Sequence, residues 1–181
     1  MRASVFNVIG FQIGWFACVL GAAHGLPWLG IFVAVPIIVW HLFNASDVRL
    51  ELKLILIATM LGSLFDQALL SANLVQFPQS NWPAQILPVW MMTLWLLFCT
   101  TLNVSLRWMR SQVAVAVLFG ALGGPLAYLG GAKLGAMQLH NVPQLMIILP
   151  IGWGIMMLVM LWLSARLDGF AGNTKARLSN V

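Results

Sequence analysis

Six runs of mainly apolar residues alternate with short polar connectors along the chain. A helix of about 20 apolar residues crosses a hydrocarbon core of about 30 Å, and it satisfies its backbone hydrogen bonds within the segment. The pattern therefore predicts an all-α integral membrane bundle of six transmembrane helices. This bundle occupies residues 1–167 and is followed by a short polar cytoplasmic tail at residues 168–181. The runs lie near residues 5–23, 27–43, 54–73, 85–105, 112–132 and 143–165.

Basic residues fall almost entirely on one side of these predicted spans. Cytoplasmic loops of membrane proteins carry an excess of Lys and Arg, so we expect both termini to be cytoplasmic. Lys133, before the last span, is the exception. The expected location is the bacterial inner membrane, as a multi-pass protein. The residues on the predicted cytoplasmic side are Arg2, Arg49, Lys53, Arg107, Arg110, Arg166, Lys175 and Arg177.

The composition strengthens the membrane interpretation and narrows the choice of partners. Hydrophobic residues make up 61% of the chain and charged residues 7%, whereas soluble domains carry about 25% charged residues. The formal net charge of +5 resides in connectors, so the expected partner is the lipid bilayer and not nucleic acid. Other membrane proteins or a second copy of the chain are further candidate partners. Cys18 and Cys99 lie in apolar runs without metal-ligand spacing, so we expect free thiols, no metal and no cofactor.

The fifth run contains an unusual concentration of helix breakers. Gly120 and Gly124 form a GxxxG pair, and Gly123 and Pro125 lie beside it. Small residues allow helix backbones to approach closely in lipid, which predicts tight packing of this span. The alternative is a helix that unwinds at Gly123, Gly124 and Pro125 and exposes carbonyl groups to a cavity, as in many transporters. The phosphate-binding glycine motifs GxxxxGK and GxGxxG are both missing from this segment.

Three blocks of the sequence resemble those of a known family. They are FQIGWFACVLGAA at residues 11–23, PVWMMTLWLLFCTTLN at 88–103 and GALGGPLAYLGGAKLGA at 120–136. The chain resembles an uncharacterised family of short proteobacterial multi-span inner-membrane proteins, catalogued as a domain of unknown function. This resemblance implies a location and a topology, but it assigns no activity and no site residue.

Asp66 is the only acid inside a predicted span. A carboxylate in the bilayer centre costs at least about 2.5 kcal/mol, so Asp66 should face the bundle interior or water. One interpretation is a functional site for a proton, a cation or a substrate, and the other is a structural hydrogen bond or an Asp66–Lys133 ion pair. The residues predicted to form this polar site are Asp66, Gln67, His24, Tyr128, Lys133 and His140.

A second polar layer is predicted nearer the cytoplasmic side. Gln12 and His41 fall at one depth, and Asn7 and Asn103 fall at another. Polar side chains in lipid commonly join helices through hydrogen bonds, which is the role expected for these four. The alternating charges of the connector at residues 47–53, which include Asp47, Arg49, Glu51 and Lys53, are typical of a solvated loop.

Three functions remain open from the sequence. A non-catalytic accessory or scaffold protein that packs with membrane partners fits the small size, the glycine-rich face and the missing catalytic motifs. A small transporter or permease with a polar site around Asp66 fits the buried acid and the prolines paired in alternate spans. An intramembrane lipid-modifying enzyme would need His24 with Asp66 for acid–base chemistry, but the sequence offers no evident nucleophile.

Overall fold

The computed structural model describes residues 2–78 and 82–172, and this part of the chain is helical apart from short connections. Two short strands pair in antiparallel fashion between connectors, with Val75 opposite Leu139. The sequence did not predict this ladder. In chain order the elements are α1 (Arg2–Ala23), α2 (Leu29–Phe43), α3 (Val48–Ser71), β1 (Val75–Gln76), α4 (Val89–Leu102), the 3-10 helix η1 (Arg107–Ser111), α5 (Val113–Lys133), β2 (Gln138–Leu139) and α6 (Val142–Arg166).

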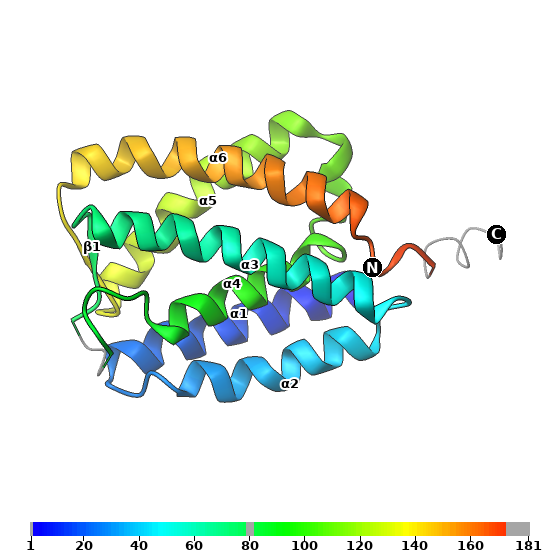
Figure 1. The fold of residues 1–181 in the computed structure, drawn as a ribbon, viewed down its shortest axis with the longest axis horizontal. Helices are drawn as coiled ribbons and strands as arrows, with labels where there is room; N and C mark the ends of the chain where they lie inside the picture. The colour runs from blue at the N-terminus through cyan, green and yellow to red at the C-terminus, as the bar shows by residue number, and fades with distance from the viewer. Residues whose placement is uncertain (1, 79–81, 173–181) are drawn as a thin grey trace.

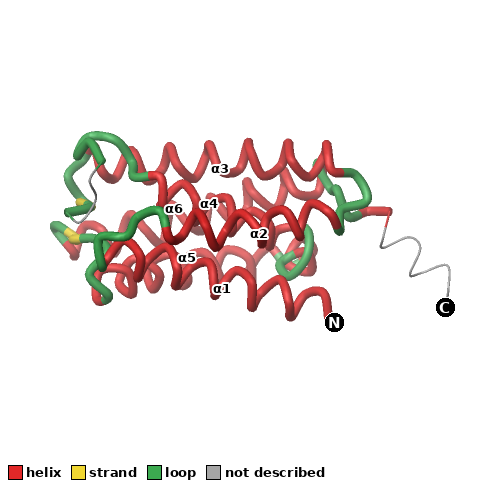
Figure 2. The backbone as a smooth tube through the Cα atoms, turned by 90° about the horizontal axis from the view of Figure 1, so that it is seen from below, coloured by secondary structure: helices red, strands yellow, loops and turns green. Residues whose placement is uncertain are grey.

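The helices run lengthwise through one bundle and alternate in direction (Figure 1; Figure 2). At one end of the bundle α1 begins and α6 ends, and the α2–α3 connector and η1 lie there too (Figure 1). We call it the basic end because of the arginines that η1 places there. It carries Arg107 and Arg110 of η1, whereas Lys133 lies at the opposite end, at the last residue of α5. Lys175 and Arg177 lie outside the described residues. The side of the membrane that the basic end faces stays a prediction.

Four of the helices are long and apolar enough to span a membrane. They are α1, α3, α5 and α6, while α2 and α4 are shorter apolar helices of 15 and 14 residues. Large apolar side chains such as Phe32 and Phe43 point outward and are 76% and 82% exposed. An outer surface of this kind suits lipid rather than water. The structure thus supports a membrane-spanning helical bundle, and the spanning of α2 and α4 stays a prediction.

The glycine-rich span is a continuous helix. α5 runs without interruption through Pro125, so the alternative in which it unwinds at this point is wrong. Gly120 lies against Trp153 and Met157 of α6, and a methyl group at Gly124 would overlap the Trp153 ring. Gly123 instead faces open space. Close packing on α6 therefore explains Gly120 and Gly124 but not Gly123. A proline such as Pro125 is compatible with a membrane helix, because neighbouring groups can satisfy the backbone carbonyl that it leaves without a partner.

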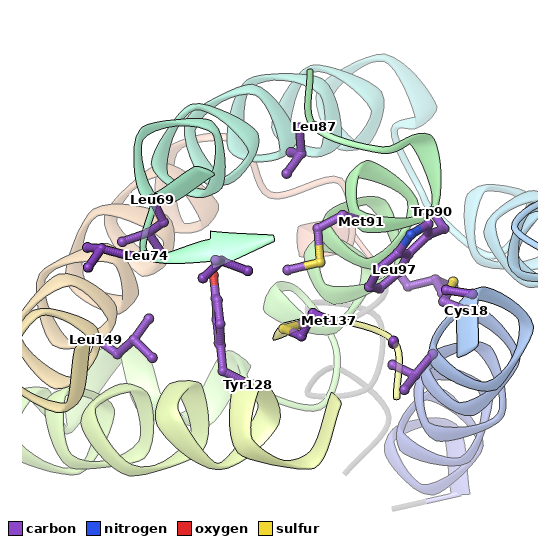
Figure 3. Close-up of a cluster of buried hydrophobic side chains, with 14 of the residues drawn as sticks. Cys18, Leu69, Leu74, Leu87, Trp90, Met91, Leu97, Tyr128, Met137 and Leu149 are labelled. Atoms are coloured by element: carbon purple, nitrogen blue, oxygen red, sulfur yellow. The ribbon is translucent and has the colours of Figure 1, made fainter. Parts of the chain in front are cut away.

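The helices divide into two packed groups. α5 packs along α6, and its contacts with α1 and α4 are sparse, whereas α1 to α4 pack against one another. Buried side chains from both groups meet in the core, where Tyr128 of α5 belongs to the same cluster as Met91 and Met137 (Figure 3). Cys18 and Cys99 are buried and free, as predicted. The seam between the two groups is where the first polar site lies.

Helix α3 begins earlier than the hydrophobic pattern indicated. Asp47 caps its N-terminus by accepting from the backbone N–H groups of Arg49 and Leu50, which satisfies donors that have no partner within the helix. The predicted span began near residue 54, so the first two turns were assigned to a connector. Glu51 therefore lies inside α3 and is completely buried, and its assignment to a solvated loop was wrong.

Candidate functional site: two buried acids on one helix

Asp66 lies in the interior of the bundle, where it is 2% exposed. Its Oδ2 accepts a hydrogen bond of 2.7 Å from Nε1 of Trp95 on α4. Its Oδ1 accepts a hydrogen bond from the hydroxyl group of Tyr128 on α5. We call these three residues the Asp66 site. The aspartate thus joins three helices, and one of its two bonds crosses the seam to α5.

The indole of Trp95 is fixed by packing as well as by its hydrogen bond. It stacks on Trp153 of α6, with ring centroids 4.8 Å apart and planes inclined by 16°. Gly62 of α3 lies directly beneath the Trp95 ring, and Gly124 of α5 lies against Trp153. A side chain at either glycine would overlap an indole. The two glycines therefore give the stacked pair its space and help to orient the donor to Asp66.

A small cavity adjoins the Asp66 site. Its volume is about 70 Å³, and Tyr128 and Trp95 form part of its wall. The wall is mostly apolar and comes from both helix groups, so the cavity lies at the seam between them. Its lining residues are Phe11, Trp15, Val19, Met91, Leu94, Trp95, Phe98, Ala127, Tyr128, Met137 and Trp153.

Of the six residues predicted for this site, the structure brings together Asp66 and Tyr128. The Gln67 side chain turns to the connector before α4, where its Oε1 accepts from the N–H of Leu87 and its Nε2 donates to the carbonyl of Gln85. This amide holds the connector before α4 in place, and none of its hydrogen bonds within the described residues goes to Asp66. Trp95, the third member of the site, was missed because an indole in an apolar run carries no polar signal of its own.

The remaining predicted members of the site lie at the surface. His24 is exposed, and its Nδ1 lies 2.8 Å from the carbonyl oxygen of Leu20. Lys133 and His140 are also exposed, and Lys133 forms none of the ion pairs found in the described residues. The alternative of an Asp66–Lys133 pair is therefore wrong for this structure. The His24 and Asp66 pair that a lipid-modifying enzyme would need is not assembled either.

Glu51 forms the centre of a second buried polar site at the basic end. Its Oε1 lies 2.7 Å from Nε2 of His41 on α2, and both side chains are almost fully buried. Its Oε2 accepts a hydrogen bond from the amide of Asn103, which follows α4. His41 and Asn103 were predicted for the second polar layer, and the acid between them was not.

Arg110 extends this network toward the chain's C-terminal segment. Its guanidinium group donates to the side chains of Asn103, Ser164 and Asp168, with Nη1 2.8 Å from Oδ2 of Asp168. Arg107 forms a second ion pair with Asp168. We call His41, Glu51, Asn103, Arg110, Ser164 and Asp168 the Glu51 cluster.

The residues after α6 close the Glu51 cluster. Gly169 packs directly on Glu51, since a Cβ at Gly169 would lie 2.6 Å from the Cβ of Glu51. The backbone N–H of Asp47 donates to the carbonyl of Gly169 at 2.9 Å, and the Phe170 ring lies 5.0 Å from the His41 ring. Gly169 and Phe170, which the sequence analysis placed in the polar tail, therefore pack against the bundle. The part of the predicted tail at residues 173–181 lies outside the described residues.

The other members of the predicted second layer are placed separately. Asn7 donates to the carbonyl of Thr100 at 3.1 Å and accepts from the hydroxyl of Ser105 at 2.7 Å, which joins α1 to the end of α4. Gln12 is exposed on the outer face of α1. Asn7 and Asn103 thus bond to different partners and form two separate links.

A periodic signal in α3 could have revealed Glu51. The buried residues of this helix include Glu51, Ile55, Ala58, Gly62 and Asp66. Their spacing of three and four residues places them on one face. Extending the buried face of Asp66 back toward the start of the helix leads to Glu51.

In the described residues, no group of three or more His, Cys, Asp or Glu side chains could hold a metal ion.

The comparisons with known proteins assign a family and no activity. Residues 4–159 match the family described as "Protein of unknown function (DUF2878)". Because the match covers most of the chain, the protein belongs to this family. No curated protein and no solved structure matches it. The family and the apolar helices together describe a membrane protein whose activity is not established.

Proposed function

We propose that this protein is a non-catalytic accessory or scaffold protein of the bacterial inner membrane, which packs with other membrane proteins. The observation that supports this proposal is the state of the two buried acids. Both oxygens of Asp66 and both oxygens of Glu51 accept from or lie within hydrogen-bond distance of side chains of the chain itself. Buried polar groups that are fully paired hold helices together. Neither acid offers a free oxygen to a substrate.

The proposal also includes a membrane topology. All six helices cross the bilayer, and the basic end faces the cytoplasm because Lys and Arg are retained on that side. Single cysteines placed at Lys133 and at Arg49 in a variant with Cys18 and Cys99 replaced by alanine would test the orientation in intact cells. A membrane-impermeant maleimide should label position 133 and not position 49. Labelling of both positions, or of position 49 alone, would contradict this topology.

Site-specific photo-crosslinking in cells tests the scaffold function. A photoreactive amino acid is introduced at exposed positions on different helices: Phe32 of α2, Leu122 of α5 and Ile147 of α6. A packing partner should give one discrete protein adduct from one helix face, and the other faces should give lipid adducts. The adduct should disappear when a charged residue is placed one turn away on the same face. Lipid adducts from every face would contradict the proposal.

A small transporter is the second candidate, and the cavity beside Tyr128 and Trp95 favours it. In this function the cavity would be part of a path along the seam between the two helix groups. Purified protein in liposomes with an entrapped pH dye tests it, with Asp66→Asn as the inactive variant and Asp47→Asn as the matched control. A proton flux that Asp66→Asn abolishes and Asp47→Asn retains would replace the scaffold function with transport. Equal flux through both variants would remove the transport candidate.

A further inference from the structure

Three basic residues at the basic end have no acidic partner within the described residues. Arg49, Lys53 and Arg166 are exposed, and none of them takes part in the ion pairs found there. The two acids outside the core at this end are already engaged. Asp47 caps the start of α3, and Asp168 is bound by two arginines of η1. The three positive charges are therefore available to an anion from outside the chain.

Lys53 and Arg166 lie at a similar depth on two neighbouring helices. α3 and α6 run in opposite directions, and Gly169, just after α6, packs on Glu51 of α3. Arg166 comes three residues before Gly169, and Lys53 comes two residues after Glu51. Both steps lead away from the basic end, and a helix rises only about 1.5 Å per residue. An ammonium group and a guanidinium group are thus offered at one level on adjacent helices.

Exposed apolar side chains continue from these two cations along the same pair of helices. A methyl group at Gly152 of α6 would overlap the Phe65 ring of α3. Arg166 lies about four helical turns after Gly152, so it projects from the side of α6 that faces α3. We call Lys53, Arg166 and the exposed apolar residues below them the α3–α6 surface. These apolar residues are Ile57, Met60 and Leu64 of α3 and Ile155 and Val159 of α6.

The α3–α6 surface has the dimensions of one lipid leaflet. From Lys53 to Leu64 helix α3 rises about 16 Å, which is about half of a hydrocarbon core of about 30 Å. At the charged end, the Cζ atom of Arg166 lies 4.0 Å from the ring centre of Trp162. Stacking on an indole orders the guanidinium group, whose N–H edge matches the geometry of a phosphate.

We propose that the α3–α6 surface binds an anionic phospholipid, with its phosphate at Lys53 and Arg166 and an acyl chain along the apolar residues. The phosphate accepts charge-assisted hydrogen bonds from both side chains. Arg49, one turn before Lys53, adds a third positive charge that disfavours the cationic headgroup of a zwitterionic lipid. This site does not depend on the scaffold function, because the surface faces lipid whether or not another face of the bundle packs with a protein.

Native mass spectrometry of the full-length protein in a non-ionic detergent tests this proposal. Phosphatidylglycerol is compared with phosphatidylcholine of identical acyl chains, and phosphatidylglycerol should bind at least about tenfold more tightly. The double variant Lys53→Gln/Arg166→Gln should lose this preference, and it should fold because both positions are exposed. Lys133→Gln removes an exposed cation at the opposite end of the bundle, so it should retain the preference.

A water-soluble headgroup distinguishes a lipid site from a site for a free phosphate ester. Glycerophosphoglycerol, which has no acyl chains, should not displace phosphatidylglycerol at equal concentration. Displacement would overturn the proposal, because the apolar residues would then contribute nothing to binding. Equal affinity for the two phospholipids would also overturn it, as would a preference that the double variant retains.

Photo-crosslinking in cells tests whether a protein covers the same surface. A photoreactive amino acid at Met60, which is 56% exposed, should give phospholipid adducts. A discrete protein adduct from this position would overturn the lipid site while supporting the scaffold function. The two proposals therefore fail separately.

Discussion

Asp66 and Glu51 lie on the same face of α3, but their surroundings differ. Asp66 is held in the middle of the bundle by two aromatic donors, and a cavity lies beside it. Glu51 lies at the basic end in a continuous network that includes Arg110, Asp168 and the residues after α6. The Asp66 site is a local link between three helices, whereas the Glu51 cluster joins α2, α3, the end of α4, η1 and α6 at the basic end. Since a network loses several bonds when one member is removed, the two acids should respond differently to substitution.

The largest effect is expected when Glu51 is removed. In Glu51→Ala, His41 and Asn103 lose their shared acceptor in a fully buried position. Breaking a buried pair of this kind typically costs about 3–5 kcal/mol. Lys53→Ala, an exposed position in the same turn of α3, should change stability by less than about 0.5 kcal/mol. Unfolding titrations in mixed micelles measure both values, and equal losses would show that the Glu51 cluster contributes nothing specific.

An intermediate loss of stability is expected when Gly124 of α5 is replaced, and the structural change should be confined to the Asp66 site. A methyl group at Gly124 overlaps Trp153, which stacks on Trp95, whereas Gly123 faces open space. Overpacking of this kind typically costs about 1–3 kcal/mol. Gly124→Ala should therefore destabilise the protein and change the near-ultraviolet circular dichroism of the stacked indoles. Gly123→Ala should do neither, and identical spectra for the two variants would show that the indole stack does not depend on Gly124.

The smallest effect on stability is expected for Asp66→Asn. The amide keeps a carbonyl oxygen for one of the two donors and leaves the other without an acceptor, so the loss should be about 1 kcal/mol. The same titration measures this loss beside that of Glu51→Ala. A loss for Asp66→Asn equal to or larger than the loss for Glu51→Ala would reverse the comparison between the local link and the network.

The candidate sites were only partly visible in the sequence. The rarity of acids in apolar runs identified Asp66, and the depth of Tyr128 along α5 placed it near the acid. His24, Lys133 and His140 were assigned to the same site because depth along a helix was the sole guide, and depth does not fix which way a side chain points. Glu51 was missed because neighbouring charges made the start of α3 resemble a connector. Trp95 was missed because its polar N–H is hidden in an apolar side chain.

Apolar helices joined by short connectors could be predicted before any packing was known, because the apolar runs and the basic connectors are local patterns that survive in any packing. The small residues of the fifth run also predicted close packing at Gly120 and Gly124, but unwinding at Gly123, Gly124 and Pro125 stayed open until the structure showed a continuous helix packed on α6. The donors that meet Asp66, and the packing of Gly169 on Glu51, became visible in the folded bundle alone. These contacts join residues far apart in the chain, and their formation depends on the relative rotation of packed helices, which no local pattern encodes.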